Sequence, residues 1–415
     1  MSTPEHPGVA DRRYAIAREK ARQIAGILRR EQIDALLVLS REGSDPCVPL
    51  LVGAKTVHLA AMFFGTDGEH TILTSESDRA HFEETGVFST VAAYGASLEE
   101  PFLAELARRA PRRLALNVSE TDHLSDGLTR GLYLWLRDTV AADALASVEV
   151  SSEAVLAELR GIKSPTELER MRTAVTITCD IYDAVRRSVR CGMSECEIGE
   201  LFTHEMAARG VVNGIEHAMA PPLVCLVRAG LAHRKPGDTK SEPGDVMVVD
   251  FSVEYEGYTS DIARTFYFLR PGEHAAPPEV QHAFDTTVGA VDASYAALRA
   301  GAKGYEVDAA GRRFIEEAGY PTIRHSVGHQ VGREAHDGGV VLGPRRDPPR
   351  PAVEGTVRVG EVYAVEPTVI QDDRKPSCIV EDNVLVTDDG LEVLSRRQRE
   401  LWLVAPPEPG DGVAP

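Results

Sequence analysis

Two stretches of the chain have the pattern of β-hairpins in which both strands carry an acidic residue. The first stretch, DVMVVDFSVEYEGYTSDIARTF, covers residues 245–266 and contains two apolar, β-branched runs separated by EYEG. If Tyr255 and Glu256 form a two-residue loop, Asp250 lies opposite Asp261, with Cβ atoms about 5 Å apart. Like charges placed in this way destabilise a sheet, unless a cation lies between them.

The second stretch, EVYAVEPTVIQDDRKPSCIVEDNVLVT, covers residues 361–387 and repeats this arrangement. With Asp373 and Arg374 as the loop, Glu366 lies opposite Glu381, and Pro376 must occupy an edge or a bulge. A solvated face would explain one acidic pair equally well. Two pairs among apolar neighbours favour burial, which costs many kcal/mol for uncompensated carboxylates.

Histidines that could complete a metal site lie on both sides of the first hairpin in the sequence. The stretch HSVGHQVGREAHDGG supplies His325, His329 and His336 among glycines, and His233 lies in RAGLAHRKPGD, just before the first hairpin. Several carboxylates with one imidazole suit Mn, Fe, Co or Zn. The pattern therefore predicts a transition-metal centre, although a structural role for each single histidine stays open.

Composition excludes several classes of partner. The 415 residues carry a formal net charge of -19 with no basic patch, which disfavours nucleic acid as a partner. The polar N-terminus lacks a signal-peptide core, and no run approaches the roughly 20 apolar residues of a membrane span. The six cysteines form no C-x-x-C pair. A cytoplasmic protein without membrane contact is expected.

Secondary-structure patterns divide the chain into two domains and a tail. Residues 1–155 alternate amphipathic helices with short apolar strands, which predicts an α/β domain with helices on a mixed sheet. Ser164, Pro165 and Glu167 form a capping-box pattern that marks a helix start near a domain boundary, and Ser194 caps a second helix. Residues 156–405 form the second domain, which begins with these helices and is rich in strands from about residue 220, with further helices expected at 278–299 and 303–318. Residues 406–415 show no sign of order.

The order Asp, Asp, His, Glu, Glu resembles that of the creatinase/prolidase-type metallopeptidases, which include aminopeptidase P, prolidase and methionine aminopeptidase. The stretches that carry the resemblance are GDVMVVDFSVEYEGYTSDIARTF, HSVGHQVGREAHD, GEVYAVEPTV, IVEDNVLVT and the helix start GIKSPTELERMRTA. The resemblance covers residues 155–400. It implies an α+β chain with a pita-bread catalytic domain after an α/β creatinase-type N-terminal domain.

The family also implies roles for individual residues. Five residues correspond to the ligands of two divalent ions (Mn, Co, Fe or Zn): Asp250, Asp261, His329, Glu366 and Glu381. Asp261 and Glu381 are expected to bridge both ions, Asp250 to complete one, and His329 with Glu366 the other. His233, His336 and Glu366 are expected to act in catalysis, in which a metal-bridging hydroxide attacks an amide bond. His325 is expected to line the substrate pocket.

One position departs from the proline-directed members of the family. Ile379 stands where those members usually carry an arginine, so the chain resembles a divergent member of the family, in which this expected substrate-binding position is apolar. The favoured function is a Xaa-Pro aminopeptidase or dipeptidase, with a small peptide or amide as substrate and a homodimer as the assembly. A creatinase-like C–N hydrolase or lyase of a non-peptide molecule is the alternative, and a non-catalytic binding protein is a third possibility.

Overall fold

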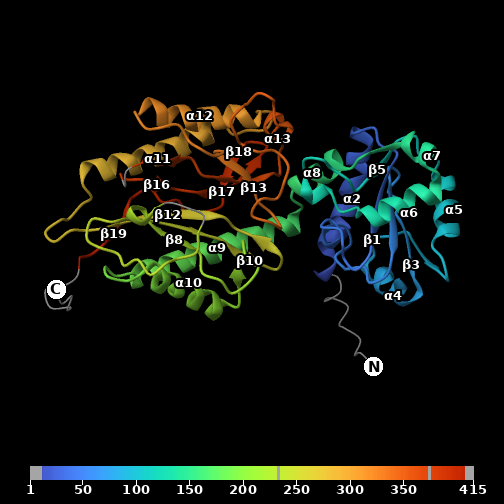
Figure 1. Cartoon of the computed structure of the whole chain (residues 1–415), viewed down its shortest axis with the longest axis horizontal. Coiled ribbons are helices and arrows are strands. Elements are labelled where there is room, and N and C mark those ends of the chain that lie inside the picture. Colours follow the sequence, from blue (N-terminus) through green and yellow to red (C-terminus); the bar gives the residue numbers. More distant parts are fainter. Residues whose placement is uncertain (1–11, 231–233, 373–374, 407–415) are drawn as a thin grey trace. The chain divides into compact units, whose positions relative to one another are not determined.

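The structure is a computed structural model that describes residues 12–230, 234–372 and 375–406. The chain divides into two compact units, Met1–Arg160 and Gly161–Pro415. Helices and strands are labelled in Figure 1. The expected tail lies outside the described residues, except for Pro406.

The N-terminal unit is built on one six-stranded mixed sheet with the order β4-β3-β2-β1-β5-β6. Its strands are β1 (Ala35–Ser40), β2 (Ala60–Gly65), β3 (Thr71–Ser75), β4 (Thr90–Tyr94), β5 (Leu114–Leu116) and β6 (Glu149–Ser151). Its helices are α2 (Ala15–Arg30), α3 (Val48–Val52), α4 (Glu76–Thr85), α5 (Glu99–Arg109), η1 (His123–Ser125), α6 (Arg130–Val140), α7 (Ala142–Ala146) and α8 (Glu153–Gly161), which extends one residue into the next unit.

Apolar cores lie on both faces of this sheet, and successive side chains of the central strands pack alternately into one core and the other. Leu36 and Val38 of β1 pack into the cluster that contains the apolar face of α2. Leu37 and Leu39, the intervening residues, pack into the cluster that contains Phe102 of α5 and the leucines of α6. Since successive side chains of a strand point to opposite faces, a strand buried on both sides must be apolar throughout, as β1 is.

The C-terminal unit combines helices with several small sheets. Its strands are β7 (Val212–Asn213), β8 (Leu223–Leu226), β9 (Val246–Phe251), β10 (Val253–Tyr255), β11 (Tyr258–Thr259), β12 (Ile262–Phe268), β13 (Gly328–Gln330), β14 (Val362–Val365), β15 (Thr368–Val369), β16 (Cys378–Ile379), β17 (Asp382–Thr387), β18 (Gly390–Val393) and β19 (Trp402–Val404). Its helices are α9 (Pro165–Ser188), α10 (Glu195–Arg209), η2 (Val227–Ala229), α11 (Pro278–Ala297), α12 (Gly304–Glu317) and α13 (Pro351–Glu354).

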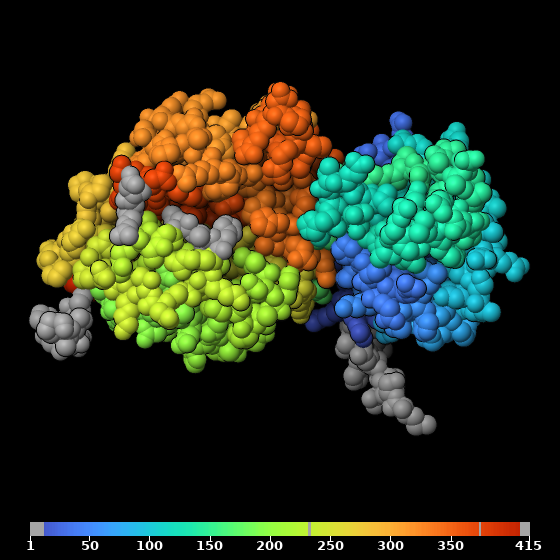
Figure 2. Space-filling model, in the orientation of Figure 1, coloured from blue at the N-terminus to red at the C-terminus, as the bar shows by residue number. Residues whose placement is uncertain are grey.

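Two four-stranded sheets of this unit carry the residues of interest. Their orders are β19-β12-β9-β8 and β13-β14-β17-β18. Helices α9 and α10 share one buried apolar cluster with β8, β9 and β12, and α11 and α12 share another with β14 and β17. The helices accordingly lie on opposite sides of the strands in Figure 1. On the face shown in Figure 2, the green-to-yellow segments from α9 to β12 adjoin the orange-to-red segments from α11 to β18.

The helix starts of the C-terminal unit confirm the capping predictions. Ser164 and Ser194 each accept a hydrogen bond from the backbone of a glutamate three residues later, and that glutamate reaches back to the cap. The helices expected at 278–299 and 303–318 begin and end within two residues of the predicted positions. Among the helices of the described ranges, none is both long and apolar enough to cross a membrane.

Candidate metal centre

The five expected ligands come from the two four-stranded sheets. Asp250 lies in β9, and Asp261 directly precedes β12 of the same sheet. His329 lies in β13, Glu366 directly follows β14, and Glu381 directly precedes β17 of the other sheet. Each sheet therefore contributes acidic residues from the ends of neighbouring strands.

The register predicted for the first hairpin is wrong by two residues. The turn is Glu256–Gly257, not Tyr255–Glu256, and its two φ angles are 47° and 78°. Glycine adopts this left-handed conformation readily, which moves the turn toward Gly257. Asp250 consequently pairs with Ala263 rather than with Asp261. A shift of two residues preserves the alternation of side chains, and the two aspartates still repel each other electrostatically.

The register predicted for the second hairpin is confirmed. Strand β14 ends with Val365 opposite Asp382, and the short ladder of β15 and β16 continues in the same register. Glu366 and Glu381 occupy the interval between these two ladders. The loop proposed at residues 373–374 lies outside the described residues.

Three of the expected ligands converge most closely. One potential ligand atom each of Asp261, His329 and Glu381 lies within 4.8 Å of the other two, and all three residues are buried. His329 Nε2 is 3.7 Å from Asp261 Oδ2 and 3.7 Å from Glu366 Oε1. His329 Nδ1 lies 3.3 Å from the carbonyl oxygen of Gln330, to which it can donate. This contact makes Nε2 the nitrogen that would hold a metal ion.

The carboxylates of this cluster are unfavourable in their charged form. Burial, followed by repulsion from Asp250 and Glu366, raises the pKa of Asp261 well above its ordinary value. Burial, followed by repulsion from Asp261, raises the pKa of Glu381 in the same way. Burial and then Asp250 raise the pKa of Glu366 to about 8. A divalent cation would remove this cost, and the oxygen-rich donor set with one imidazole fits the metals expected.

Two further histidines lie beside the cluster. The ring of His336 is 4.2 Å from that of His329, centroid to centroid. Burial, followed by the charge of His336, lowers the pKa of His329 to about 3, so His329 is neutral at physiological pH, as a metal ligand must be. His325 Nε2 is 2.8 Å from Thr368 Oγ1, and its Nδ1 is 3.9 Å from Glu366 Oε1. His233 lies outside the described residues.

Ile379 lies in β16 opposite Thr368. Its backbone N–H donates to Thr265 Oγ1 over 3.0 Å, and the Thr265 hydroxyl donates to its carbonyl over 2.7 Å. The side chain is half-buried against the apolar cluster of α11 and α12. Asp250 also lines a recess, whose further walls include Asn213, Ile215, Pro221, Leu223, Lys235 and Pro236.

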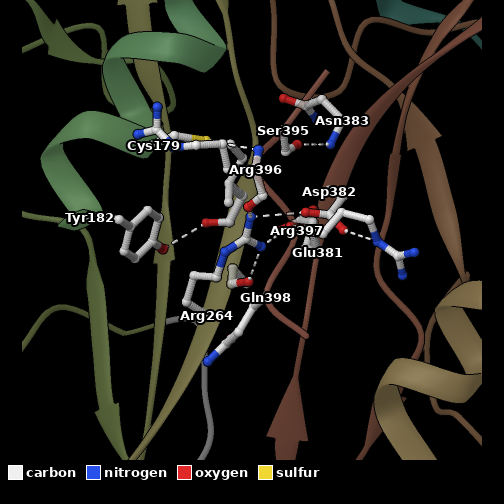
Figure 3. Close-up of polar contacts among 12 residues, drawn as sticks. Cys179, Tyr182, Arg264, Glu381, Asp382, Asn383, Ser395, Arg396, Arg397 and Gln398 are labelled. Atoms are coloured by element: carbon white, nitrogen blue, oxygen red, sulfur yellow. Dashed lines mark hydrogen bonds and ion pairs between the residues drawn. The ribbon is translucent and has the colours of Figure 1, made fainter. Parts of the chain in front are cut away.

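Sequence analysis missed a buried polar network behind Glu381, which Figure 3 shows. Arg264 is fully buried, and its Nη2 donates to Asp382 Oδ1 over 2.9 Å. Its Nη1 donates to the backbone carbonyl of Glu381 over 2.6 Å. An arginine in the middle of an apolar strand was a signal for this network, because a buried guanidinium needs a partner.

Comparisons with known proteins find similar sequences. The sequence profile of metallopeptidase family M24 matches residues 169–388. A Xaa-Pro dipeptidase of Pyrococcus furiosus is 28% identical over 251 residues, which are 60% of this chain and 66% of that protein. The chain thus spans just under two thirds of the length of this curated relative.

Solved structures establish the fold. A Xaa-Pro dipeptidase from Bacillus anthracis superposes with a TM-score of 0.71 at 20% identity, over 94% of this chain and 100% of that one. The prolidase from Pyrococcus horikoshii OT3 gives a TM-score of 0.68 at 22% identity, over 92% of this chain and 99% of that one. The expected α+β class with a pita-bread domain is confirmed.

Proposed function

Because the chain belongs to metallopeptidase family M24, we propose that it is a dinuclear metal-dependent hydrolase of the Xaa-Pro aminopeptidase or dipeptidase type. The observation that carries the proposal is the convergence of Asp261, His329 and Glu381, with ligand atoms within 4.8 Å of one another. Glu366 adjoins this group through His329. The charge of Asp250 repels the carboxylates of Asp261, Glu366 and Glu381 and raises their pKa values, so Asp250 belongs to the same cluster.

The five ligands divide between two cation positions in this proposal. Asp261 and Glu381, whose pKa values are raised well above their ordinary values by burial and by neighbouring carboxylates, would be shared between both cations. Asp250 completes the position on the side of β9, and His329 with Glu366 completes the other. Two positive ions balance four carboxylates, which removes the repulsion that raises the pKa values of these groups.

When bound, two divalent cations would supply acidification of a water molecule and polarisation of the scissile carbonyl. The residues of the chain supply the remaining steps. Glu366, whose Oε1 lies 3.7 Å from His329 Nε2, is proposed to accept the proton of the attacking water and to pass it to the leaving nitrogen. His336, whose ring lies beside that of His329, is proposed to donate a hydrogen bond to the developing oxyanion. His233 is proposed for the same role.

Residues around the carboxylate cluster are proposed to contact the substrate. The recess next to Asp250 has apolar walls formed by Ile215, Pro221 and Leu223, which suit an apolar side chain of a small peptide. His325 and Ile379 are proposed to contact the substrate from the β15–β16 side. The resemblance of the chain to Xaa-Pro dipeptidases supports proline after the scissile bond.

The cellular compartment, the native metal and the oligomeric state are also proposed. All six cysteines lie within the described ranges and form no disulfide with one another there, which supports a reducing cytoplasm. Manganese is proposed as the native metal, with Co, Fe and Zn as the other candidates, and a homodimer as the assembly. Light scattering of the purified chain tests the last point.

The decisive test combines metal analysis with a substrate panel. Protein purified without chelator should contain one to two transition-metal ions per chain. After loading with Mn, Co, Fe or Zn in turn, it should hydrolyse at least some Xaa-Pro dipeptides and tripeptides. Asp261→Ala should lose bound metal and activity together. Glu256→Gln, on the turn of the same hairpin with a half-exposed side chain, is the matched control and should keep both.

The outcomes separate the alternatives. Absence of metal from the unaltered protein, or activity that survives Asp261→Ala, contradicts the dinuclear site. Fully metallated protein that cleaves no peptide of the panel, but does turn over creatine or a related C–N substrate, assigns the chain to the non-peptide alternative.

A further inference from the structure

The two carboxylates proposed to be shared between the cations belong to different sheets. Asp261 precedes β12 in the sheet β19-β12-β9-β8, whereas Glu381 precedes β17 in the sheet β13-β14-β17-β18. Among the described strands, no ladder pairs β12 with β17. Backbone pairing within each sheet therefore does not fix the separation of the two carboxylates, and other contacts have to do so.

Side chains from each strand bind the backbone of the other beside these carboxylates. Asn383 Nδ2 donates to the carbonyl of Asp261 over 2.9 Å, and the Asp261 N–H donates to Asn383 Oδ1 over 2.9 Å. In the opposite direction, Arg264 Nη1 donates to the carbonyl of Glu381 over 2.6 Å. The N–H of Glu381 donates to the carbonyl of Ala263 over 3.1 Å. These four bonds cross between the sheets within three residues of each carboxylate.

The two side chains that make these bonds are themselves held in place. Asn383 is fully buried, and its own N–H donates to Ser395 Oγ over 2.7 Å. Arg264 is fixed by Asp382 and by the carbonyl of Arg396, 2.7 Å from its Nη2 (Figure 3). Because water is excluded from this region, breaking a bond leaves a buried polar group unpaired or moves the backbone.

We propose that Asn383 and Arg264 form a reciprocal clamp that sets the separation of Asp261 and Glu381, and that Asn383 is thereby a positioning residue for metal binding. The clamp rests on the proposed metal centre. A carboxylate shared between two cations tolerates little displacement, because both of its oxygens have to meet ions at fixed distances. Loss of the Asn383 amide should leave the ligands present but their spacing loose.

The same unit contains a matched control for this amide. Gln398 is also buried and makes the same pair of bonds to one residue of β12: its Nε2 donates to the carbonyl of Thr265 over 2.7 Å, and the Thr265 N–H donates to its Oε1 over 3.0 Å. Thr265 lies four residues beyond Asp261. Gln398→Ala therefore removes an equivalent clamp from the same strand without touching either carboxylate.

The experiment measures Mn²⁺ binding to full-length, chelator-treated protein by calorimetric titration, with melting temperatures determined in parallel. Asn383→Ala should weaken Mn²⁺ binding about 10- to 100-fold, the range found when an outer partner of a metal ligand is lost. Gln398→Ala should lower the melting temperature comparably but change the Mn²⁺ dissociation constant by less than about twofold. If Asn383→Ala does not fold, Asn383→Ser replaces it, since the serine hydroxyl is too short to reach both backbone groups.

The results distinguish a failed clamp from a failed function. Equal Mn²⁺ affinities in the Asn383 and Gln398 variants would overturn the clamp, even with lowered stability, because Asn383 would then be a structural residue only. No binding of Mn²⁺, Co²⁺ or Zn²⁺ by the unaltered protein would overturn the proposed function, and the clamp with it.

Discussion

Replacement of Lys163 by methionine tests how strongly a buried ion pair supports the loop that carries His336. Lys163 Nζ lies 2.9 Å from Asp337 Oδ2, and the two side chains are 0% and 2% exposed. The loop backbone packs closely on this pair: a Cβ atom at Gly332 would lie 2.0 Å from Asp337 Oδ2 and 2.7 Å from Lys163 Nζ. The backbone of the loop at Gly332 is therefore in close contact with the ion pair.

The expected magnitude follows from this burial. Removal of one partner of a buried pair leaves an uncompensated charge and costs about 3–5 kcal/mol. For a unit of this size each kcal/mol lowers the melting temperature by about 2–4 °C, which gives a fall of roughly 6–20 °C. The pair between Arg172 and Glu392 is shorter, at 2.6 Å, but its side chains are 44% and 45% exposed. Arg172→Met should therefore cost no more than about 1 kcal/mol.

Fluorescence can follow the C-terminal unit alone. The chain has two tryptophans, Trp135 in the N-terminal unit and Trp402 in the C-terminal unit. In a Trp135→Phe background, the remaining signal comes from Trp402, which contacts the ring of Phe266. If Lys163→Met and Arg172→Met lower the melting temperature equally in this background, the reasoning is refuted. The buried pair would then contribute no more stability than the exposed pair. Asp337→Asn, added to Lys163→Met, should restore part of the stability because the lone charge is gone.

Two predictions concern pH. The pKa of Glu366 rises from 4.5 to about 8 on folding without metal, so the metal-free protein binds more protons folded than unfolded, and its melting temperature should fall between pH 6 and pH 8.5. Added Mn²⁺ should abolish most of this fall, and a metal-free protein that is equally stable across this range contradicts the prediction. His217 hydrogen-bonds Glu254 and then Glu334, which raises its pKa, so its stabilisation is present below about pH 6.5 and is lost as pH rises through the folded value. His217→Gln should thus cost up to about 1 kcal/mol at pH 6 and less at pH 9, and an equal cost at both values would show that the charge of His217 is irrelevant.

The two hairpins show what local patterns can and cannot specify. The second register follows from counting residues back from a two-residue loop, because no glycine within that stretch competes for the turn. In the first hairpin Gly257 takes a positive φ and shifts the turn by one residue, so the pairing shifts by two. The alternation survives, which is why Asp250 and Asp261 were assigned to one site despite the wrong partner.

Contacts between the sheets could not be predicted from either hairpin. Asn383 and Asp261 are 122 residues apart, and nothing in the pattern of β17 indicates which backbone its side chain binds. The bonds between Gln398 and Thr265 could not be predicted either, since a polar residue near the end of a chain is ordinarily expected to be exposed. The buried Arg264 is different, because a charged residue within the apolar run IARTFYF required an internal partner.

Anomalous diffraction from crystals grown with Mn²⁺ tests the metal centre most directly. Two peaks are expected, both next to Asp261 and Glu381, with Asp250 beside one peak and His329 with Glu366 beside the other. Data collected above and below the manganese absorption edge identify the metal. Crystals of active protein with no peak among these five residues, or with Mn²⁺ bound only elsewhere, would contradict the account.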